Sequence, residues 1–295
     1  MARVISISNQ KGGVGKTTTT INLSSFVALF GFKVLVVDID PQGNTTSGFG
    51  IAGEKKDNLK NTIYEVMMGD ATVKETVCKT TIPNLDVVPA TMDFAGADSE
   101  LMELAESREK VLRKALSSVR GDYDYIFIDC PPSLNIFSVN ALTASDGVLI
   151  PMPGDFFSLE GIGQLMNTVK LVKKHRNPGL EIEGVFMTIY DGRSNLANQV
   201  AAEVSRWFGK SVFKTRIPRN VRLGEAPSHG LPVIQYEPNS KGSVAYMELA
   251  VEMLRRHGHD VKPLTGLSKY KYRAPAETKK VAKKTDGEKK TASKE

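Results

Sequence analysis

The residues best suited to chemistry are glycines and lysines near the N-terminus. The sequence KGGVGKTT occupies residues 11–18, directly after a run typical of a strand. Its glycines let the backbone turn so that consecutive N–H groups face one concavity, and the helix that follows adds its positive end there. Such a loop binds the phosphates of a nucleotide, and the lysine reaches the β- and γ-phosphates while the next hydroxyl ligates Mg²⁺. The expected nucleotide contacts are Gly12, Gly13, Val14, Gly15, Lys16, Thr17 and Thr18, with Thr17 also a metal ligand.

The loop departs from the common phosphate-loop pattern GxxxxGK[ST]. That pattern places glycine at position 10, where this chain has Gln10 followed by Lys11. The form KGGxGK[ST] resembles the deviant Walker A signature of the phosphate-loop ATPase family that contains ParA, MinD and the nitrogenase iron protein. The resemblance implies that Lys11 binds and acts on the phosphates held by the other subunit of a face-to-face dimer. A cation supplied in this way would tie hydrolysis to dimerisation. The alternative is a solvated lysine beside a glycine-rich turn.

Two aspartates follow the second apolar run, in VLVVDIDPQGNTTSG. If the sheet is parallel, Asp38 and Asp40 lie at the same edge as the phosphate loop. The resemblance implies that Asp40 is both catalytic, orienting the attacking water, and part of the metal site, and that residues 42–44 form a first switch loop. We expect Asp38 to support the metal site from behind. Aspartates that only cap the next turn are the alternative.

A third carboxylate ends another apolar run, in YDYIFIDCPPS. A strand that delivers an aspartate in this way is the Walker B pattern, so Asp129 is expected to hold Mg²⁺, usually through a water. Pro131 and Pro132 stiffen the following turn, which can then act as a second switch that senses the γ-phosphate.

Runs of β-branched or aromatic residues alternate with helix-length segments, and these runs and segments predict the strands and helices that position the candidate residues. Apolar runs with helices between them are typical of a parallel sheet covered on both faces. We expect strands at Val4–Ser8, Val34–Asp38, Leu85–Val88, Tyr125–Asp129, Val148–Pro151 and Gly184–Ile189. We expect helices at Lys16–Phe30, Ser99–Val119, Leu134–Ala144, Leu159–His175, Leu196–Phe208 and Val244–Arg256. The sequence therefore predicts an α/β fold with a single doubly wound, mostly parallel sheet.

Positive charge is concentrated at the C-terminus. The chain carries a formal net charge of +6, but residues 262–295 alone hold 11 Lys and Arg against 4 Asp and Glu. This segment has few apolar residues, so burial cannot offset the entropy of ordering it. We expect residues 1–260 to form a ParA-type phosphate-loop ATPase domain and residues 261–295 to be a disordered, Lys-rich tail. The tail either prolongs residence on DNA or is only a solubilising extension.

Cysteines and apolar runs exclude other classes of protein. Cys78 and Cys130 lie far apart and form no CxxC pair, which argues against a disulfide framework, a zinc site or an iron–sulfur cluster. The N-terminus lacks a signal segment, and no run reaches the roughly 18 apolar residues that a membrane span needs. We expect a cytoplasmic protein with no membrane contact.

The resemblance extends over residues 1–257 and points to the chromosomal ParA/Soj branch, through LDVVPA, SLEGIGQL and PRNVRLGEAPSHG. It implies that Pro218 and Asn220 cradle the adenine, and that Arg193 and Arg222 bind DNA without reading its sequence. Arg219 and Lys214 are further DNA-binding candidates. Each of these cations is alternatively a solvated surface residue.

The function that follows is ATP-dependent DNA partitioning. ATP and Mg²⁺ are expected to assemble a homodimer that binds double-stranded DNA of the nucleoid, and a ParB-like centromere-binding partner is expected to stimulate hydrolysis and release. A MinD-like, membrane-associated positioning ATPase is the main alternative, although such a protein would end in an amphipathic membrane helix. An iron-protein relative and a non-catalytic DNA-binding scaffold are the other two. The sequence leaves open whether the cargo is a chromosome or a plasmid.

Overall fold

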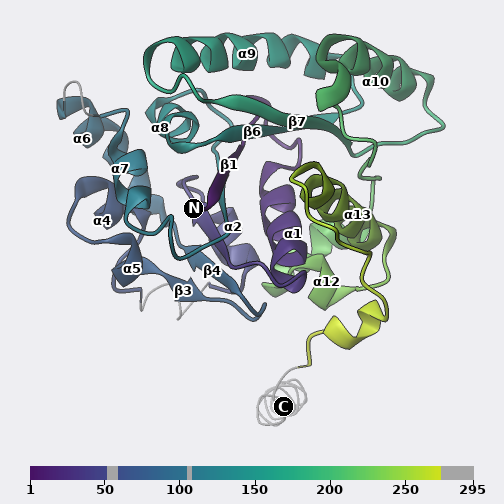
Figure 1. Cartoon of the computed structure of the whole chain (residues 1–295), viewed down its shortest axis with the longest axis horizontal. Coiled ribbons are helices and arrows are strands. Elements are labelled where there is room, and N and C mark those ends of the chain that lie inside the picture. Colours follow the sequence, from purple (N-terminus) through teal and green to yellow (C-terminus); the bar gives the residue numbers. More distant parts are fainter. Residues whose placement is uncertain (52–58, 105–107, 274–295) are drawn as a thin grey trace, which may run out of the picture.

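A seven-stranded sheet forms the centre of the protein. The computed structural model describes residues 1–51, 59–104 and 108–273. The strand order is β3-β4-β2-β5-β1-β6-β7 (Figure 1). All neighbouring strands pair in parallel except β3 and β4, so the predicted doubly wound, mostly parallel sheet is confirmed. The strands are β1 (Arg3–Ile7), β2 (Val34–Asp38), β3 (Cys78–Lys79), β4 (Leu85–Val88), β5 (Tyr125–Asp129), β6 (Gly147–Pro153) and β7 (Glu181–Thr188).

The inner strands are apolar throughout because both of their faces are covered. Strands β2, β4 and β5 are buried at every position. Successive side chains of a strand point to opposite faces of the sheet. Val34 and Val36 therefore belong to one hydrophobic cluster, and Leu35 and Val37 belong to the cluster on the other face. An alternating polar pattern would leave one of these clusters without its contacts.

Helices cover the two faces of the sheet (Figure 1). On one face α1 (Lys16–Leu29) packs against α13 (Lys241–Arg256), with α12 (Val233–Tyr236) beside them. The cluster on the other face is built from α4 (Ile63–Met68), α6 (Ala97–Glu103), α7 (Val111–Ser117) and α8 (Ile136–Ala144). Two longer helices, α9 (Phe157–His175) and α10 (Asn195–Phe208), cover β6 and β7.

Several helices begin at a side-chain cap. Thr62 and Glu65 form a capping box at the start of α4, and Thr72 and Glu75 form another before the four-residue helix α5 (Val73–Thr76). Ser240 accepts a hydrogen bond from the backbone of Ser243 and so caps α13. The remaining short elements are α2 (Asn44–Gly48), α11 (Val221–Glu225), and the 3₁₀ turns η1 (Met92–Gly96), η3 (Gly209–Ser211), η4 (Ala226–His229) and η5 (Leu267–Tyr270).

The predicted ends of several elements shift by a few residues, and two differences concern whole elements around residues 99–119 and 78–79. The single helix predicted over residues 99–119 is described as α6 and α7, and residues 105–107 between them lie outside the described chain. Strand β3 was not predicted, because two residues are too short for any periodic pattern. These two residues are a strand because their backbone pairs antiparallel with β4.

Residues 261–273, which composition placed in the tail, pack against the domain. Val261, Leu264, Leu267 and Tyr270 recur every three residues and contact the cluster of α1, α12 and α13. The backbone N–H of Tyr272 donates to the Gln235 carbonyl at 2.9 Å. The Lys-rich composition conceals this apolar spacing. The rest of the predicted tail, residues 274–295, lies outside the described residues.

A chain of polar contacts joins distant segments at the amino edge of the sheet. The guanidinium of Arg3 contacts the carboxylate of Glu183 at 2.7 Å, and Glu183 also pairs with the imidazole of His257. The other ring nitrogen of His257 lies 2.9 Å from the hydroxyl of Tyr125. Burial raises the pKa of Glu183, but the hydrogen bond from His257 and the charges of His257 and Arg3 outweigh it, so its pKa lies below the usual value.

Candidate nucleotide-binding site

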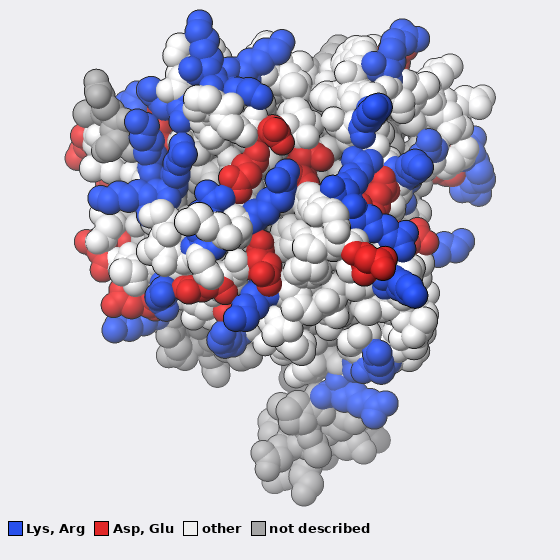
Figure 2. Space-filling model, viewed as in Figure 1, with Lys and Arg blue, Asp and Glu red and all other residues white. Residues whose placement is uncertain are grey.

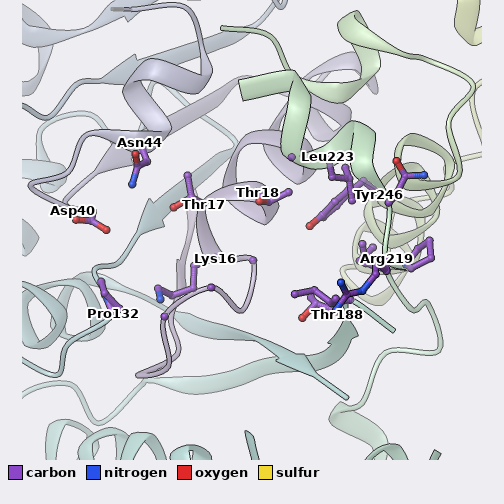
Figure 3. A pocket seen from close by; sticks show the side chains of 18 of the residues that line it. Lys16, Thr17, Thr18, Asp40, Asn44, Pro132, Thr188, Arg219, Leu223 and Tyr246 are labelled. Carbon is purple, nitrogen blue, oxygen red and sulfur yellow. The ribbon is translucent and has the colours of Figure 1, made fainter. Parts of the chain in front are cut away.

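A cleft of about 550 Å³ lies where the parallel strands β1, β2, β5 and β7 end. Figure 3 shows Asp40, Asn44 and Pro132 at one end of it, and Leu223, Tyr246 and Arg219 at the other. The phosphate loop lies between these ends. The cleft is lined by Gly12, Gly13, Gly15, Lys16, Thr17, Thr18, Asp40, Gln42, Asn44, Pro132, Thr188, Ile189, Ile217, Pro218, Arg219, Asn220, Leu223, Gly224 and Tyr246.

The loop between β1 and α1 has the geometry of a phosphate cradle. Gly13 and Gly15 have φ angles of +71° and +93°, a conformation that other residues adopt only with strain. A Cβ added at Gly12 or Gly13 would meet no atom within 4 Å, so this part of the loop opens into the cleft. Helix α1 begins at Lys16, directly after the loop. The loop therefore presents open backbone and a positive helix end to the same space.

Lys16 supplies a buried positive charge at the loop. Its side chain is only 6% exposed, and Nζ donates to the Lys11 carbonyl at 3.2 Å. Burial lowers the pKa of Lys16, and the nearby charge of Asp129 only partly opposes this. Within the described chain Lys16 has no carboxylate ion-pair partner. An anion such as a phosphate would supply the missing charge.

Asp129 at the end of β5 is held by three hydroxyl groups. Its Oδ2 accepts hydrogen bonds from Thr17 at 2.8 Å and from Thr45 at 2.7 Å, and Oδ1 accepts one from Thr20 at 3.0 Å. The carboxylate is fully buried, and burial raises its pKa. Thr17 therefore connects the phosphate loop directly to Asp129.

Asp38 lies beside Asp129 in register across β2 and β5. Its Oδ2 accepts from the hydroxyl of Thr46 at 2.7 Å and from the Thr46 backbone N–H at 2.9 Å. Burial and the adjacent charge of Asp129 raise its pKa. Two buried carboxylates with raised pKa values favour a cation nearby.

The donor set fits a magnesium ion. Carboxylate and hydroxyl oxygens are ligands that Mg²⁺ prefers, and the ion usually takes its remaining ligands from water and phosphate. Thr17 and Asp129 would hold the ion, with Asp40 near it. Among the described residues, no group of three or more His, Cys, Asp or Glu side chains could hold a metal ion.

Asp40 faces the cleft from the loop after β2. It is 7% exposed, and its Oδ1 accepts from the backbone N–H of Gln42 at 3.0 Å. Its own N–H donates to Asp38 at 3.2 Å. Pro132 reaches the cleft from the turn after β5. The two segments predicted to act as switches thus meet at the same end of the cleft (Figure 3).

Lys11 points away from the cleft of its own chain. Its Nζ forms an ion pair with Asp155 at 2.6 Å and lies 5.9 Å from the centre of the Phe157 ring. Asp155 also accepts from the backbone N–H of Ser158 at 3.1 Å, near the start of α9. Lys11 is therefore held by a carboxylate that does not line the cleft.

The opposite end of the cleft is shaped by α11. The side-chain oxygen of Asn220 accepts from the Arg222 backbone N–H at 2.9 Å and caps this helix, which leaves its amide nitrogen to face a ligand. Pro218 and Leu223 line the same end. Ile189 lines it with φ +50°, an unusual conformation for a β-branched residue. The structure thus brings Pro218 and Asn220 into the cleft with the phosphate loop.

The four predicted DNA-binding cations have different surroundings. Arg219 lines the cleft. Arg193 pairs with Asp191 at 2.9 Å, and Arg222 pairs with Glu225 at 2.6 Å. Lys214 is exposed on the segment after η3. The two family-matched arginines are therefore each neutralised by a neighbouring carboxylate.

Sequence reasoning missed several residues of the site. Thr45 and Thr46 come five and six residues after Asp40, and two adjacent threonines after a carboxylate loop are the only signal that they hold Asp129 and Asp38. Tyr246 comes from the last long helix, and its hydroxyl lies 3.0 Å from that of Thr19. No local pattern links that helix to the phosphate loop.

Comparisons with known proteins agree on one family. A family model described as an AAA domain matches residues 2–182. The chain is 53% identical to the sporulation initiation inhibitor protein Soj of Bacillus subtilis, over 86% of this chain and 98% of that protein. It is 49% identical to the chromosome partitioning protein ParA of Myxococcus xanthus, over 87% and 89%.

A solved structure supports the same fold. Cobyrinic acid a,c-diamide synthase from Mycobacterium smegmatis, with a bound ATP analogue and magnesium, superposes with a TM-score of 0.75 at 33% identity, covering 90% of this chain and 100% of that one. In the described residues, no helix is long and apolar enough to cross a membrane. By its identity to relatives over nearly their whole length, this chain belongs to the family of Soj and ParA chromosome-partitioning ATPases.

Proposed function

We propose that this protein hydrolyses ATP with Mg²⁺ and uses that cycle to partition DNA. The observation that carries the proposal is the hydrogen bond of Thr17 to Asp129, at 2.8 Å. It joins the phosphate loop, which lines the cleft together with Asp40, to a buried carboxylate behind the loop. A phosphate cradle, a metal-binding carboxylate and a carboxylate for water form the minimal set for phosphoryl transfer to water.

Each residue of the cleft has a distinct role in this proposal. Lys16 and the loop backbone bind the β- and γ-phosphates, and Thr18 contacts the α-phosphate. Thr17 and Asp129 hold Mg²⁺, which neutralises charge on the phosphates when it is bound. Asp40 orients the attacking water, and Asp38 holds the loop of α2 through Thr46. Pro218 and Asn220 bind the adenine.

Lys11 acts on a second subunit in this proposal. Its Nζ is held outside its own cleft by Asp155, a partly exposed residue, so it is free to exchange that partner for a phosphate of a facing copy. ATP would therefore assemble a homodimer, and the lysine of each subunit would complete the charge at the γ-phosphate of the other.

Double-stranded DNA is the proposed binding partner of this dimer. Arg193, Arg222, Arg219 and Lys214 are the cations proposed to meet DNA phosphates, so binding would depend on salt and little on sequence. The two named relatives support this assignment, since their names describe chromosome partitioning and sporulation control. A ParB-like, centromere-bound partner would stimulate hydrolysis and release the dimer from the nucleoid.

The test is binding to random-sequence duplex with ATP, with ADP and without nucleotide. Wild type is compared with Lys16→Ala, Asp40→Ala and Arg222→Ala. We expect wild type to bind only with ATP, Asp40→Ala to stay bound because it cannot hydrolyse, and the other two to fail. Binding that ignores the nucleotide would overturn the switch. ATP-dependent binding to anionic vesicles in place of DNA would favour the membrane-associated alternative.

A further inference from the structure

Two basic triplets with the same spacing lie on helices α7 and α9, and none of their residues lines the nucleotide cleft. Lys110, Arg113 and Lys114 occupy the N-cap and first turn of α7, and Lys170, Lys173 and Lys174 occupy the end of α9. Residues at i, i+3 and i+4 share one side of a helix. All six side chains are exposed.

The two triplets converge on one surface. The guanidinium of Arg113 donates to the carbonyl of Arg176, the residue that ends α9, at 3.5 Å. Arg176 in turn pairs with Glu109, next to the start of α7. Figure 2 shows lysine and arginine side chains gathered over α7 and α9. We call these six residues the α7–α9 basic surface.

The six side chains of the α7–α9 basic surface differ from Arg193 and Arg222 in having no ion-pair partner within the described chain. Arg193 and Arg222 each form an ion pair with a carboxylate. None of the six residues of the α7–α9 basic surface has an ion-pair partner among residues 1–51, 59–104 and 108–273. The positive potential here is therefore not cancelled locally, although the chain before residue 262 is close to neutral as a whole.

The surface lies away from the edge where the cleft opens. Lys173 and Lys174 come shortly before β7, so they lie toward the amino edge of the parallel sheet, whereas Arg193 follows the carboxyl end of β7. A ligand on the α7–α9 basic surface would leave the cleft free to face a second subunit.

We propose that the α7–α9 basic surface is a docking site for the phosphate backbone of duplex DNA, additional to the Arg193 and Arg222 region. Four residues of an α-helix rise about 6 Å, and each strand of duplex DNA carries one charge per about 3.4 Å of axis. One triplet therefore spans about two phosphates of a strand. The contacts read no bases, so this site adds affinity without specificity. The inference rests on the proposed DNA binding and adds a second surface to it.

The experiment measures binding to a random-sequence duplex with ATP across a range of KCl concentrations. One variant carries Lys170→Gln, Lys173→Gln and Lys174→Gln, and a second carries Lys110→Gln, Arg113→Gln and Lys114→Gln. The control carries Lys33→Gln, Lys60→Gln and Lys74→Gln, which removes the same charge from exposed positions elsewhere. Glutamine keeps helix propensity, and basal ATP turnover reports that each variant is folded.

We expect the slope of log affinity against log salt to become shallower by about 2 to 3 for each triplet variant, and by less than about 1 for the control. If wild type binds DNA and the triplet variants match the control, this surface is not a DNA site while the proposed function stands. If wild type binds no DNA with any nucleotide, the proposed function fails as well. Retained DNA binding with lost binding to poly-L-glutamate would assign the surface to an acidic polypeptide instead.

Discussion

Gly230 lies so close to Gly50 that a Cβ built on it would stand 2.7 Å from the Gly50 Cα. Gly50 follows the short helix α2, where Thr45 holds Asp129. Gly230 ends η4, which follows α11 and its Arg222. The backbone beside the metal-site carboxylates is therefore packed directly on the backbone that continues from Arg222, with no side chain between them.

Replacing Gly230 with alanine tests this packing. Gly230 has φ +63°, so alanine there is strained, and its methyl group also collides with Gly50. We expect the free energy of unfolding to fall by about 1–3 kcal/mol more than in Gly266→Ala. Gly266 is the control because it has φ +64° and open space at its Cβ. Urea unfolding measures both, and equal losses would show that the contact is unimportant.

The ATP dependence of DNA binding provides a second readout of Gly230→Ala. If α2 moves when ATP binds, this contact would carry the movement to the Arg222 segment. We therefore expect the ratio of DNA affinities with ATP and with ADP to fall in Gly230→Ala and to stay unchanged in Gly266→Ala.

Thr45→Val should destabilise the protein by removing a donor from Asp129. The hydroxyl of Thr45 lies 2.7 Å from that buried carboxylate, and a lost donor to a buried group costs about 1–3 kcal/mol. Ser47→Ala, in the same helix, removes a hydroxyl that no hydrogen bond in the described chain uses, and it should cost less than about 0.5 kcal/mol. Thermal unfolding without nucleotide compares the two, and similar losses would contradict the role of Thr45.

Glu183→Gln should change how stability depends on pH. The pKa of Glu183 is lowered in the folded protein, so its contribution is present above the usual glutamate pKa of about 4.3 and is lost as pH falls through the lowered value. At pH 7 we expect a loss of about 3 kcal/mol, because a buried charge pair is broken. The difference from wild type should shrink toward pH 3. Glu181→Gln, at an exposed position of the same strand, is the control. If the free energies of unfolding of Glu183→Gln and wild type still differ by as much at pH 3, the ion pair is not the cause.

Asp155→Asn should favour assembly of the dimer. The Lys11–Asp155 pair must break before Lys11 can reach a facing subunit, and a partly exposed pair is worth about 0.2–1 kcal/mol. Two such pairs break in each dimer, so we expect ATP-dependent dimerisation to tighten by about two- to thirtyfold. The asparagine oxygen can still accept from Ser158, so α9 keeps its start. Sedimentation with ATP measures the change, and Asp191→Asn removes a comparable exposed pair elsewhere as the control.

The sequence predicted the features that depend on the pattern of neighbouring residues along the chain. Strands β2, β4 and β5 have the predicted bounds because burial on both faces demands an unbroken apolar run. The phosphate loop and Asp40 also line one cleft, and Asp129 lies against Thr17 of the loop, since parallel strands deliver their ends to one edge. The partner of Lys11 was not predictable, because Asp155 is brought beside it only by the pairing of β1 with β6. The break between α6 and α7 was missed because both helices continue the same apolar period.

Strand β1 has a consequence for the order in which a ribosome can produce a working cleft. It is the first strand synthesised, yet its neighbours in the sheet are β5 and β6, which are made far later. Until β5 and β6 have been synthesised, β1 has no neighbouring strand with which to pair, and the phosphate loop that follows β1 lacks the support of the sheet. Asp129, at the end of β5, has not been translated by then either. The other end of the cleft is completed later still, by residues 217–224 and Tyr246. We therefore expect a nascent chain to lack a complete nucleotide cleft until Tyr246 has been synthesised.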